Sequence, residues 1–368
     1  MYHLHFLAVI LALIPTMFRG LECTAQRVPQ LECRQGAPDG FSVRRWPTSA
    51  FIDSTGKLIT EFVYDRVGDF SEGLAPAGKD DPPNVPNWGY VDSSGKLVIP
   101  IRFSDAKEFS EGLAPVAPAG EYGYIDRKGA FVIPPRFQYA SWFCDGLAAV
   151  RSNGKVGYID KAGSFVIQPQ FSEGEQFTEG AARVMIGGEK YQWIDSYHSG
   201  KWGYIDKQGK WLVEPRFDDA ERFSEGLAAV RIGGVEGYIN KRGEFAIAAR
   251  SWQTDSFSEG VARVKVGRKW GIIDKSGEFV IQPTFFFLGS FSEGLAPAVQ
   301  SVGNRWGYID KSGKMVIPEQ FDWAEPFSNG LARVGRRVRR KWDGHLNDGY
   351  IDPKGKFVLE PPATLDGN

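Results

Sequence analysis

The fold of this chain is decided by residues 202–230, which read WGYIDKQGKWLVEPRFDDAERFSEGLAAV, because the chain repeats this stretch many times. Its first signature, Gly-Tyr-Ile-Asp or a near copy, returns at eight glycines from Gly89 to Gly349, with a partial ninth copy at residues 51–53. Its second signature, Phe-Ser-Glu-Gly-Leu-Ala, returns in eight copies from Phe70 to Phe327. Repetition at about 34 residues is typical of stacked or radially arranged repeat domains.

All length variation falls in one connection of the unit. Gly203 and Phe223 are 20 residues apart (203 to 223), and every other pair of successive first and second signatures has this same spacing. The return from the second signature to the next first signature varies, and it is longest at residues 79–87, 188–201, 301–305 and 335–347. Because equivalent positions of a repeat share a side, we expect these four connections to lie along one edge of the array.

Each unit predicts β-strands joined by tight turns. Asp206 followed by Gly209 indicates a hairpin turn, in which the Asp accepts backbone hydrogen bonds and the Gly takes the left-handed conformation. The apolar run after the Gly predicts a second strand, and Pro215 ends it because proline cannot donate to a strand ladder. A third strand is expected at residues 147–151 and their copies. Residues 216–223 fit either a short fourth strand or a single helical turn.

These signatures resemble the WG-repeat family, named for the Trp-Gly of its repeat, over about residues 50–360. The tryptophan itself is kept in only half of the units, and Tyr122, Val156, Glu236 and Asp348 replace it in the others. Those replacements weaken any role for the tryptophan as a ligand platform. The resemblance implies an all-β repeat protein without a general enzymatic activity, and it supplies no catalytic residues. Tryptophan stands at Trp88, Trp202, Trp270 and Trp306.

We therefore predict an all-β fold, a tandem array of about eight to nine short β-meander repeats of about 34 residues, over residues 50–362. About 34 residues accommodate three strands and their turns, whereas a propeller blade usually has four strands and roughly 40 residues or more. This comparison favours an open β-repeat array, or solenoid. A closed β-propeller is the alternative.

Composition excludes several classes of function. The 44 Lys and Arg against 45 Asp and Glu give a formal net charge of -1, which argues against a globally basic nucleic-acid binder. The chain has only 4 His and 3 Cys, so a His-rich or Cys-rich metal site is not expected. No nucleophile elbow, phosphate loop or zinc spacing is present. We expect a non-enzymatic protein with no cofactor and no nucleic-acid partner.

The amino-terminal segment predicts export. Residues 6–18, FLAVILALIPTMF, are too short for a spanning helix and are typical of a signal-peptide core, with a cut expected near Gln26. Residues 1–25 are thus expected to be a signal peptide, 26–49 a linker and N-terminal cap, and 363–368 a tail; lipid anchoring and an uncleaved membrane anchor are the alternatives. The mature form would then have no integral membrane span. In an oxidising compartment Cys33 and Cys144 are able to pair, or both stay free.

Two repeated series of carboxylates look like an acidic catalytic or metal-binding ladder, but each has a telling exception. Asn240 replaces Asp in the first signature and Asn329 replaces Glu in the second. An amide accepts the same turn hydrogen bonds but cannot act as a general base. Both series are therefore interpreted as turn acceptors. The repeated aromatics, such as Tyr204 and Phe223, are interpreted as core rather than as a carbohydrate-stacking stripe.

Candidate binding residues lie where the units differ. The insertion at residues 188–201 carries exposed-ring candidates, and the basic run at residues 333–341, RVGRRVRRK, is able to attract polyanions or an acidic partner. We expect an exported, non-enzymatic bacterial scaffold that binds a protein or an envelope polymer through these loops. A cell-envelope glycan-binding or glycan-processing protein is the alternative. The candidate partner-binding residues are Tyr191, Trp193, Tyr197, His198, Arg336, Arg337, Arg339 and Arg340.

Overall fold

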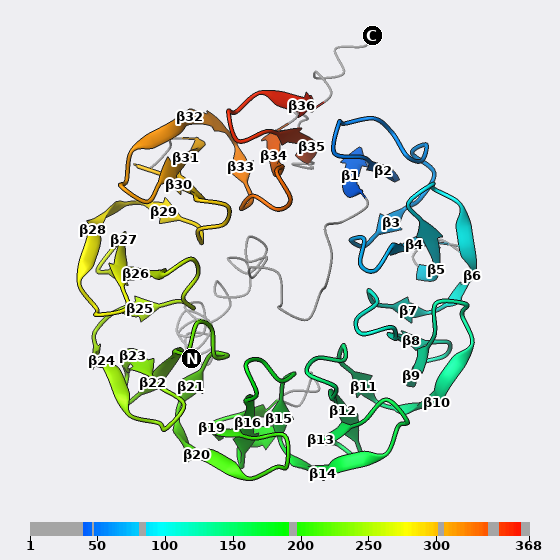
Figure 1. The fold of residues 1–368 in the computed structure, drawn as a ribbon, viewed down its shortest axis with the longest axis horizontal. Coiled ribbons are helices and arrows are strands. Elements are labelled where there is room, and N and C mark those ends of the chain that lie inside the picture. Colours follow the sequence, from blue (N-terminus) through cyan, green and yellow to red (C-terminus); the bar gives the residue numbers. More distant parts are fainter. Residues whose placement is uncertain are drawn as a thin grey trace, which may run out of the picture.

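The structure is a computed structural model, and it describes residues 40–45, 48–80, 86–190, 197–300, 305–337 and 346–361. Within these residues the secondary structure is all β, which confirms the predicted fold class. Eight four-stranded antiparallel sheets follow one another along the chain, and we call them blades 1 to 8. Figure 1 shows them arranged as a ring, each with its two-residue strand innermost.

The strands of a blade run outward in chain order. The innermost strands are β3 (Arg66–Val67), β7 (Asp105–Ala106), β11 (Tyr139–Ala140), β15 (Glu173–Gly174), β21 (Asp219–Ala220), β25 (Gln253–Thr254), β29 (Phe287–Leu288) and β33 (Trp323–Ala324). The second strands are β4 (Leu74–Asp80), β8 (Ala114–Ala117), β12 (Ala148–Ser152), β16 (Ala182–Ile186), β22 (Ala228–Ile232), β26 (Val261–Val266), β30 (Leu295–Val299) and β34 (Ala332–Arg337).

The outer half of each blade is a hairpin. The third strands are β5 (Pro86–Asp92), β9 (Tyr122–Ile125), β13 (Lys155–Ile159), β19 (Lys201–Ile205), β23 (Val235–Ile239), β27 (Lys269–Asp274), β31 (Trp306–Asp310) and β35 (Leu346–Ile351). The outermost strands are β6 (Leu97–Phe103), β10 (Phe131–Phe137), β14 (Phe165–Phe171), β20 (Trp211–Phe217), β24 (Phe245–Arg250), β28 (Phe279–Phe285), β32 (Met315–Phe321) and β36 (Phe357–Leu359). Two further pairs are β1 (Phe41–Arg45) with β2 (Thr48–Ile52), and β17 (Glu189–Lys190) with β18 (Tyr197–His198).

The chain is a closed β-propeller, so the preferred expectation of an open array is wrong and the alternative is right. A unit of about 34 residues holds four strands because the innermost strand has only two residues, as in β21. That strand also settles residues 216–223: Arg216 and Phe217 end β20, and Asp219–Ala220 form a fourth strand rather than a helical turn. The two-residue strand is too short to show a strand-like alternation in sequence, which is why counting residues gave three strands.

The β1–β2 sheet closes the ring between blade 8 and blade 1. The turn glycine Gly56 lies against blade 8, because a Cβ on it would lie 2.3 Å from the carbonyl oxygen of Val358. The corresponding Gly209 lies against the preceding blade, where its Cβ would lie 3.3 Å from the Ile167 side chain. The Tyr350 hydroxyl donates to the carbonyl oxygen of Ser42, and β1 lies against β35. Strand β1 falls in the region expected to be a linker and cap, while residues 1–25 and 363–368 lie outside the described residues.

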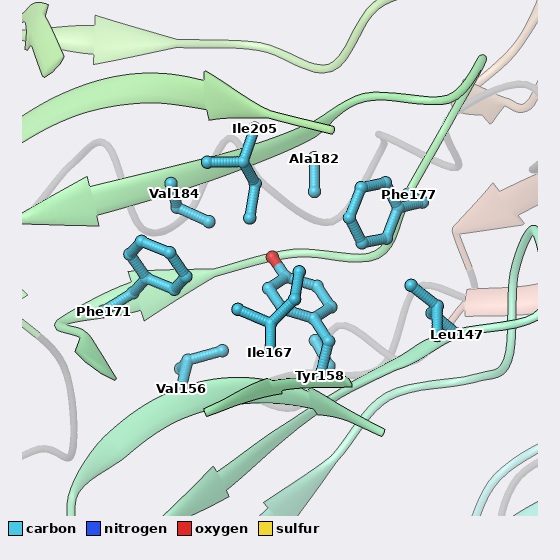
Figure 2. Packing of buried hydrophobic residues seen from close by; sticks show 10 residues of the cluster. Leu147, Val156, Tyr158, Ile167, Phe171, Phe177, Ala182, Val184 and Ile205 are labelled. Carbon is cyan, nitrogen blue, oxygen red and sulfur yellow. The ribbon is translucent and has the colours of Figure 1, made fainter. Parts of the chain in front are cut away.

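The core is divided among the interfaces between neighbouring blades. Figure 2 shows one such cluster, in which Tyr158 and Ile167 of blade 3 lie against Phe177 and Val184 of blade 4. The Tyr158 hydroxyl donates across the interface to the carbonyl oxygen of Glu175 at 2.8 Å. The core interpretation of the repeated tyrosines is confirmed, because six of them are fully buried: Tyr90, Tyr124, Tyr158, Tyr204, Tyr238 and Tyr308.

The glycine after the naming tryptophan is required by the close approach of two backbones. Trp202 pairs with Phe217 and Tyr204 with Val213, so β20 has extra residues between these pairs and bulges toward β19. A Cβ on Gly203 would lie 2.6 Å from the carbonyl oxygen of Val213. Only glycine fits so close an approach of two backbones.

Candidate functional site

The Asp of the first signature is a turn acceptor, as predicted. Oδ1 of Asp206 accepts hydrogen bonds from the backbone amides of Gln208 and Lys210, at 3.0 and 2.9 Å. Oδ1 of Asn240 makes the equivalent pair of bonds in blade 5. The amide therefore replaces the carboxylate without loss of the turn.

The Glu of the second signature has a different role from the predicted one. Glu225 has a positive φ of 54°, and its carboxylate reaches the next blade, where Oε1 and Oε2 lie 3.1 and 3.0 Å from the amide nitrogen of Gly260. Lys275 of blade 6 adds an ion pair at 3.1 Å. Equivalent bonds join each blade to the next: Glu72 to Gly112, Glu111 to Gly146, Asp145 to Gly180, Glu179 to Gly226, Glu259 to Gly294 and Glu293 to Gly330.

Asn329 marks the end of this series. It lies in blade 8 with the same φ of 54°, and its amide donates to Ser328 of its own turn. Blade 8 is followed by the β1–β2 sheet, in which the described residues contain no second-signature turn that would receive a carboxylate. The asparagine is thus explained by its place in the ring rather than by equivalence of amide and carboxylate.

Several carboxylates near the innermost strands are held by arginine. Glu175, Asp255 and Glu325 bond to Arg183, Arg263 and Arg333 of their own blades. Burial acts to raise the pKa of Glu175, but Arg183 and Arg222 lower it overall, so the carboxylate stays ionised. Among the described residues, no group of three or more His, Cys, Asp or Glu side chains is placed to hold a metal ion.

The long connections all join second to third strands, and the antiparallel order of the blades puts this connection on the same face of the ring in each unit. Tyr197 and His198 form β18 and pair with Lys190 and Glu189 in an extra hairpin of blade 4. Arg336 and Arg337 lie in β34 of blade 8. Tyr191, Trp193, Arg339 and Arg340 lie outside the described residues.

The described parts of the two candidate clusters, β18 and β34, lie apart from each other. Blade 4, which carries the β17–β18 insertion, and blade 8, which carries the arginines of β34, occupy opposite sides of the ring in Figure 1. These two described strands therefore belong to separate places on the ring.

A cluster that sequence reasoning missed lies between blades 2 and 3. Nζ of Lys107, just after β7, donates to the carbonyl oxygen of Ala140 in β11 at 2.8 Å. It also lies 4.0 Å from the ring centroid of Tyr139, 5.3 Å from that of Tyr122 and 5.5 Å from that of Trp142. The one available signal was that this position holds Ser, Gly or an acidic residue in the other units.

The ring of four-stranded antiparallel sheets defines the class: this is a β-propeller built from tandem repeats. The family model described as "WG containing repeat" matches residues 50–81, 88–117, 122–155, 157–191, 202–235, 237–270, 270–301 and 306–335. The chain therefore belongs to the WG containing repeat family, as its signatures predicted.

One match among solved structures has a TM-score above 0.5, and at 12% identity it supports the fold alone. A structure titled "Crystal structure of the eukaryotic initiation factor" matches with a TM-score of 0.61 and 12% identity, over 87% of this chain and 95% of that chain. Apo AztD from Citrobacter koseri matches with a TM-score of 0.41 and 13% identity, over 86% and 92%. No curated protein matches the chain. No helix in the described residues is long and apolar enough to cross a membrane.

Proposed function

We propose that this protein is a non-enzymatic, exported scaffold that binds a macromolecular partner, a protein or an envelope polymer, through the connections between its second and third strands. One contrast carries the proposal. The repeated acidic residues serve the fold: the Asp of the first signature builds a turn, and the Glu of the second signature joins neighbouring blades. The connections that vary in length, in contrast, lie on one face of the ring. Variable loops on a rigid ring are the usual place for partner recognition.

Export is supported by two observations. The apolar run at residues 6–18 has the length of a signal-peptide core. Cys144 is disulfide-bonded, and structural disulfides persist in oxidising compartments. The sequence left open whether Cys144 pairs with Cys33 or both stay free, and Cys33 lies outside the described residues. Sequencing the amino terminus of protein recovered from envelope or medium tests this part, and an intact Met1 on cytoplasmic protein would overturn it.

The glycan alternative receives less support from the structure. The repeated tyrosines are buried, so they do not offer a stacking stripe. Aromatic rings do converge between blades 2 and 3, but they surround Lys107. A glycosidase needs a pair of carboxylates at one site, and three of the acidic groups near the innermost strands are bonded to arginine.

The binding proposal is tested with a loop replacement whose template is in the chain itself. In blade 5, Ile232 and Val235 are joined by Gly233-Gly234, and in blade 4 the equivalent Ile186 and Lys201 flank the long insertion. Replacing residues 187–200 by two glycines removes the insertion without changing the strand register.

The second variant replaces Arg336, Arg337, Arg339 and Arg340 by serine. As a control, Arg242→Ser removes an exposed charge from a turn between third and outermost strands, on the opposite face. The immobilised mature protein is used to isolate a partner from envelope extract, and its affinity for each variant is then measured. We expect at least one loop variant to lose tenfold or more in affinity with unchanged thermal unfolding. Unchanged affinity in both loop variants would refute the proposal.

A further inference from the structure

Lys107 is not part of the connections between second and third strands that form the proposed binding face. It joins the innermost parts of blades 2 and 3, where three aromatic rings surround its ammonium group and the Ala140 carbonyl oxygen accepts a hydrogen bond from it. The Tyr122 hydroxyl donates to Asp105, which stands two residues before Lys107. Tyr139 keeps 41% of its surface exposed, so one wall of the cluster is open to solvent.

This surrounding changes the acid–base behaviour of the lysine. Burial lowers the pKa of Lys107 to about 8, although Asp105 and Glu108 favour its charged form. At pH 7.5 roughly a quarter of such a lysine is neutral, against about one part in a thousand for an ordinary lysine. The neutral amine is the nucleophilic form.

We propose that Lys107 is a modification site at which small planar aldehydes form an imine. The Nζ lone pair attacks the carbonyl carbon and forms the C–N bond, while the carbonyl electron pair moves to oxygen, which takes a proton. The nitrogen loses a proton to solvent, and the hydroxyl leaves as water after a second protonation. The amine and the aldehyde thus give an imine and one water, with no oxidant or reductant. The rings of Tyr122, Tyr139 and Trp142 provide apolar faces against which a planar adduct stacks.

The matched controls are lysines of the same protein. Lys161 and Lys207 lie in turns and are ion-paired with Glu111 and Asp145 at 3.1 and 3.7 Å. The labelling rates of these two lysines and of Lys107 are measured in the same sample, so reagent concentration and pH are identical for all three. Lys107→Arg keeps a cation over the rings and removes the nucleophile, so it tests the assignment of the label with little disturbance of packing.

The experiment uses salicylaldehyde with the full mature protein, reductive trapping by cyanoborohydride and peptide mapping by mass spectrometry. We expect Lys107 to be labelled at least tenfold faster than Lys161 and Lys207 at pH 7.5, with a rate that rises through a midpoint near pH 8. Lys107→Arg should abolish this label alone. Tyr139→Ala should move the midpoint upward, because the amine becomes hydrated. Labelling of Lys107 no faster than of Lys161, or a midpoint near 10 in the unmodified protein, would overturn the proposal.

Discussion

Replacing Glu225 by alanine removes the carboxylate that joins blade 5 to blade 6. The substitution leaves the left-handed backbone at this position, with φ of 54°, so the conformational cost is similar before and after. What is lost is the contact with the Gly260 amide at 3.0 Å and the ion pair with Lys275 at 3.1 Å. The effect therefore reports the contact between blades.

The magnitude follows from these contacts. A hydrogen bond to a charged group contributes about 1.5–3 kcal/mol when it is buried. The Glu225 side chain is 28% exposed and Lys275 is 47% exposed, so solvent weakens the bond and the ion pair adds little. We expect Glu225→Ala to lower the free energy of unfolding by about 1–2 kcal/mol. Glu225→Gln keeps an acceptor oxygen and should cost about 0.5 kcal/mol.

Two measurements separate this explanation from a local turn effect. Urea unfolding gives the stability loss, and amide hydrogen exchange reports on Gly260, whose exchange should accelerate while that of Gly294, bonded by Glu259, should not. Asn329→Ala is the matched control, because Asn329 has the same φ but bonds within its own turn. A loss in Asn329→Ala as large as in Glu225→Ala, or unchanged exchange at Gly260, would show that the carboxylate does not act between blades.

Three further outcomes are expected. Asp206→Asn should be nearly neutral in thermal unfolding, whereas Gly209→Val, at φ of 80° and against Ile167, should cost about 1 kcal/mol or more; similar large losses would restore a role for the charge. The pKa of Lys107 is lowered to about 8 on folding, so the unfolded chain binds more protons between about pH 8 and 10.5 and stability should rise with pH there. Relative to Lys107→Met, the wild type should gain about 1–2 kcal/mol between pH 7.5 and 9.5, and a flat difference in urea unfolding would contradict this. A reducing agent should lower the stability of the wild type by about 2 kcal/mol or more, because Cys144 is disulfide-bonded. Cys144→Ser has no disulfide to reduce, and serine fits this place because most other blades have it, so its stability should not change. Equal sensitivity of both proteins would argue against a stabilising disulfide at Cys144.

The local part of the fold could be predicted from the repeat itself. Spacing and residue type predict three features: the Asp206 turn with its left-handed Gly209, the strand at residues 147–151 and the burial of Tyr204. These features depend on contacts within a few residues or within one unit. Asn240 in place of Asp was enough to identify a turn acceptor. The location of the long connections was also visible, because insertions are recorded directly in chain length.

The tertiary structure decided what passes between units. Closure into a ring depends on contacts that join residues far apart in sequence, such as Gly56 against Val358 of β36 and β1 against β35. The same reason explains why the Glu series and Asn329 were misread, and why Lys107 went unnoticed: their partners belong to the next blade. A repeat signature shows which residues recur, but it does not show whether the partner of each residue lies in the same unit or in the next one. The sequence by itself therefore determined the unit, and only the packing of one unit on the next determined the propeller, the inter-blade bonds and the aromatic cluster around Lys107.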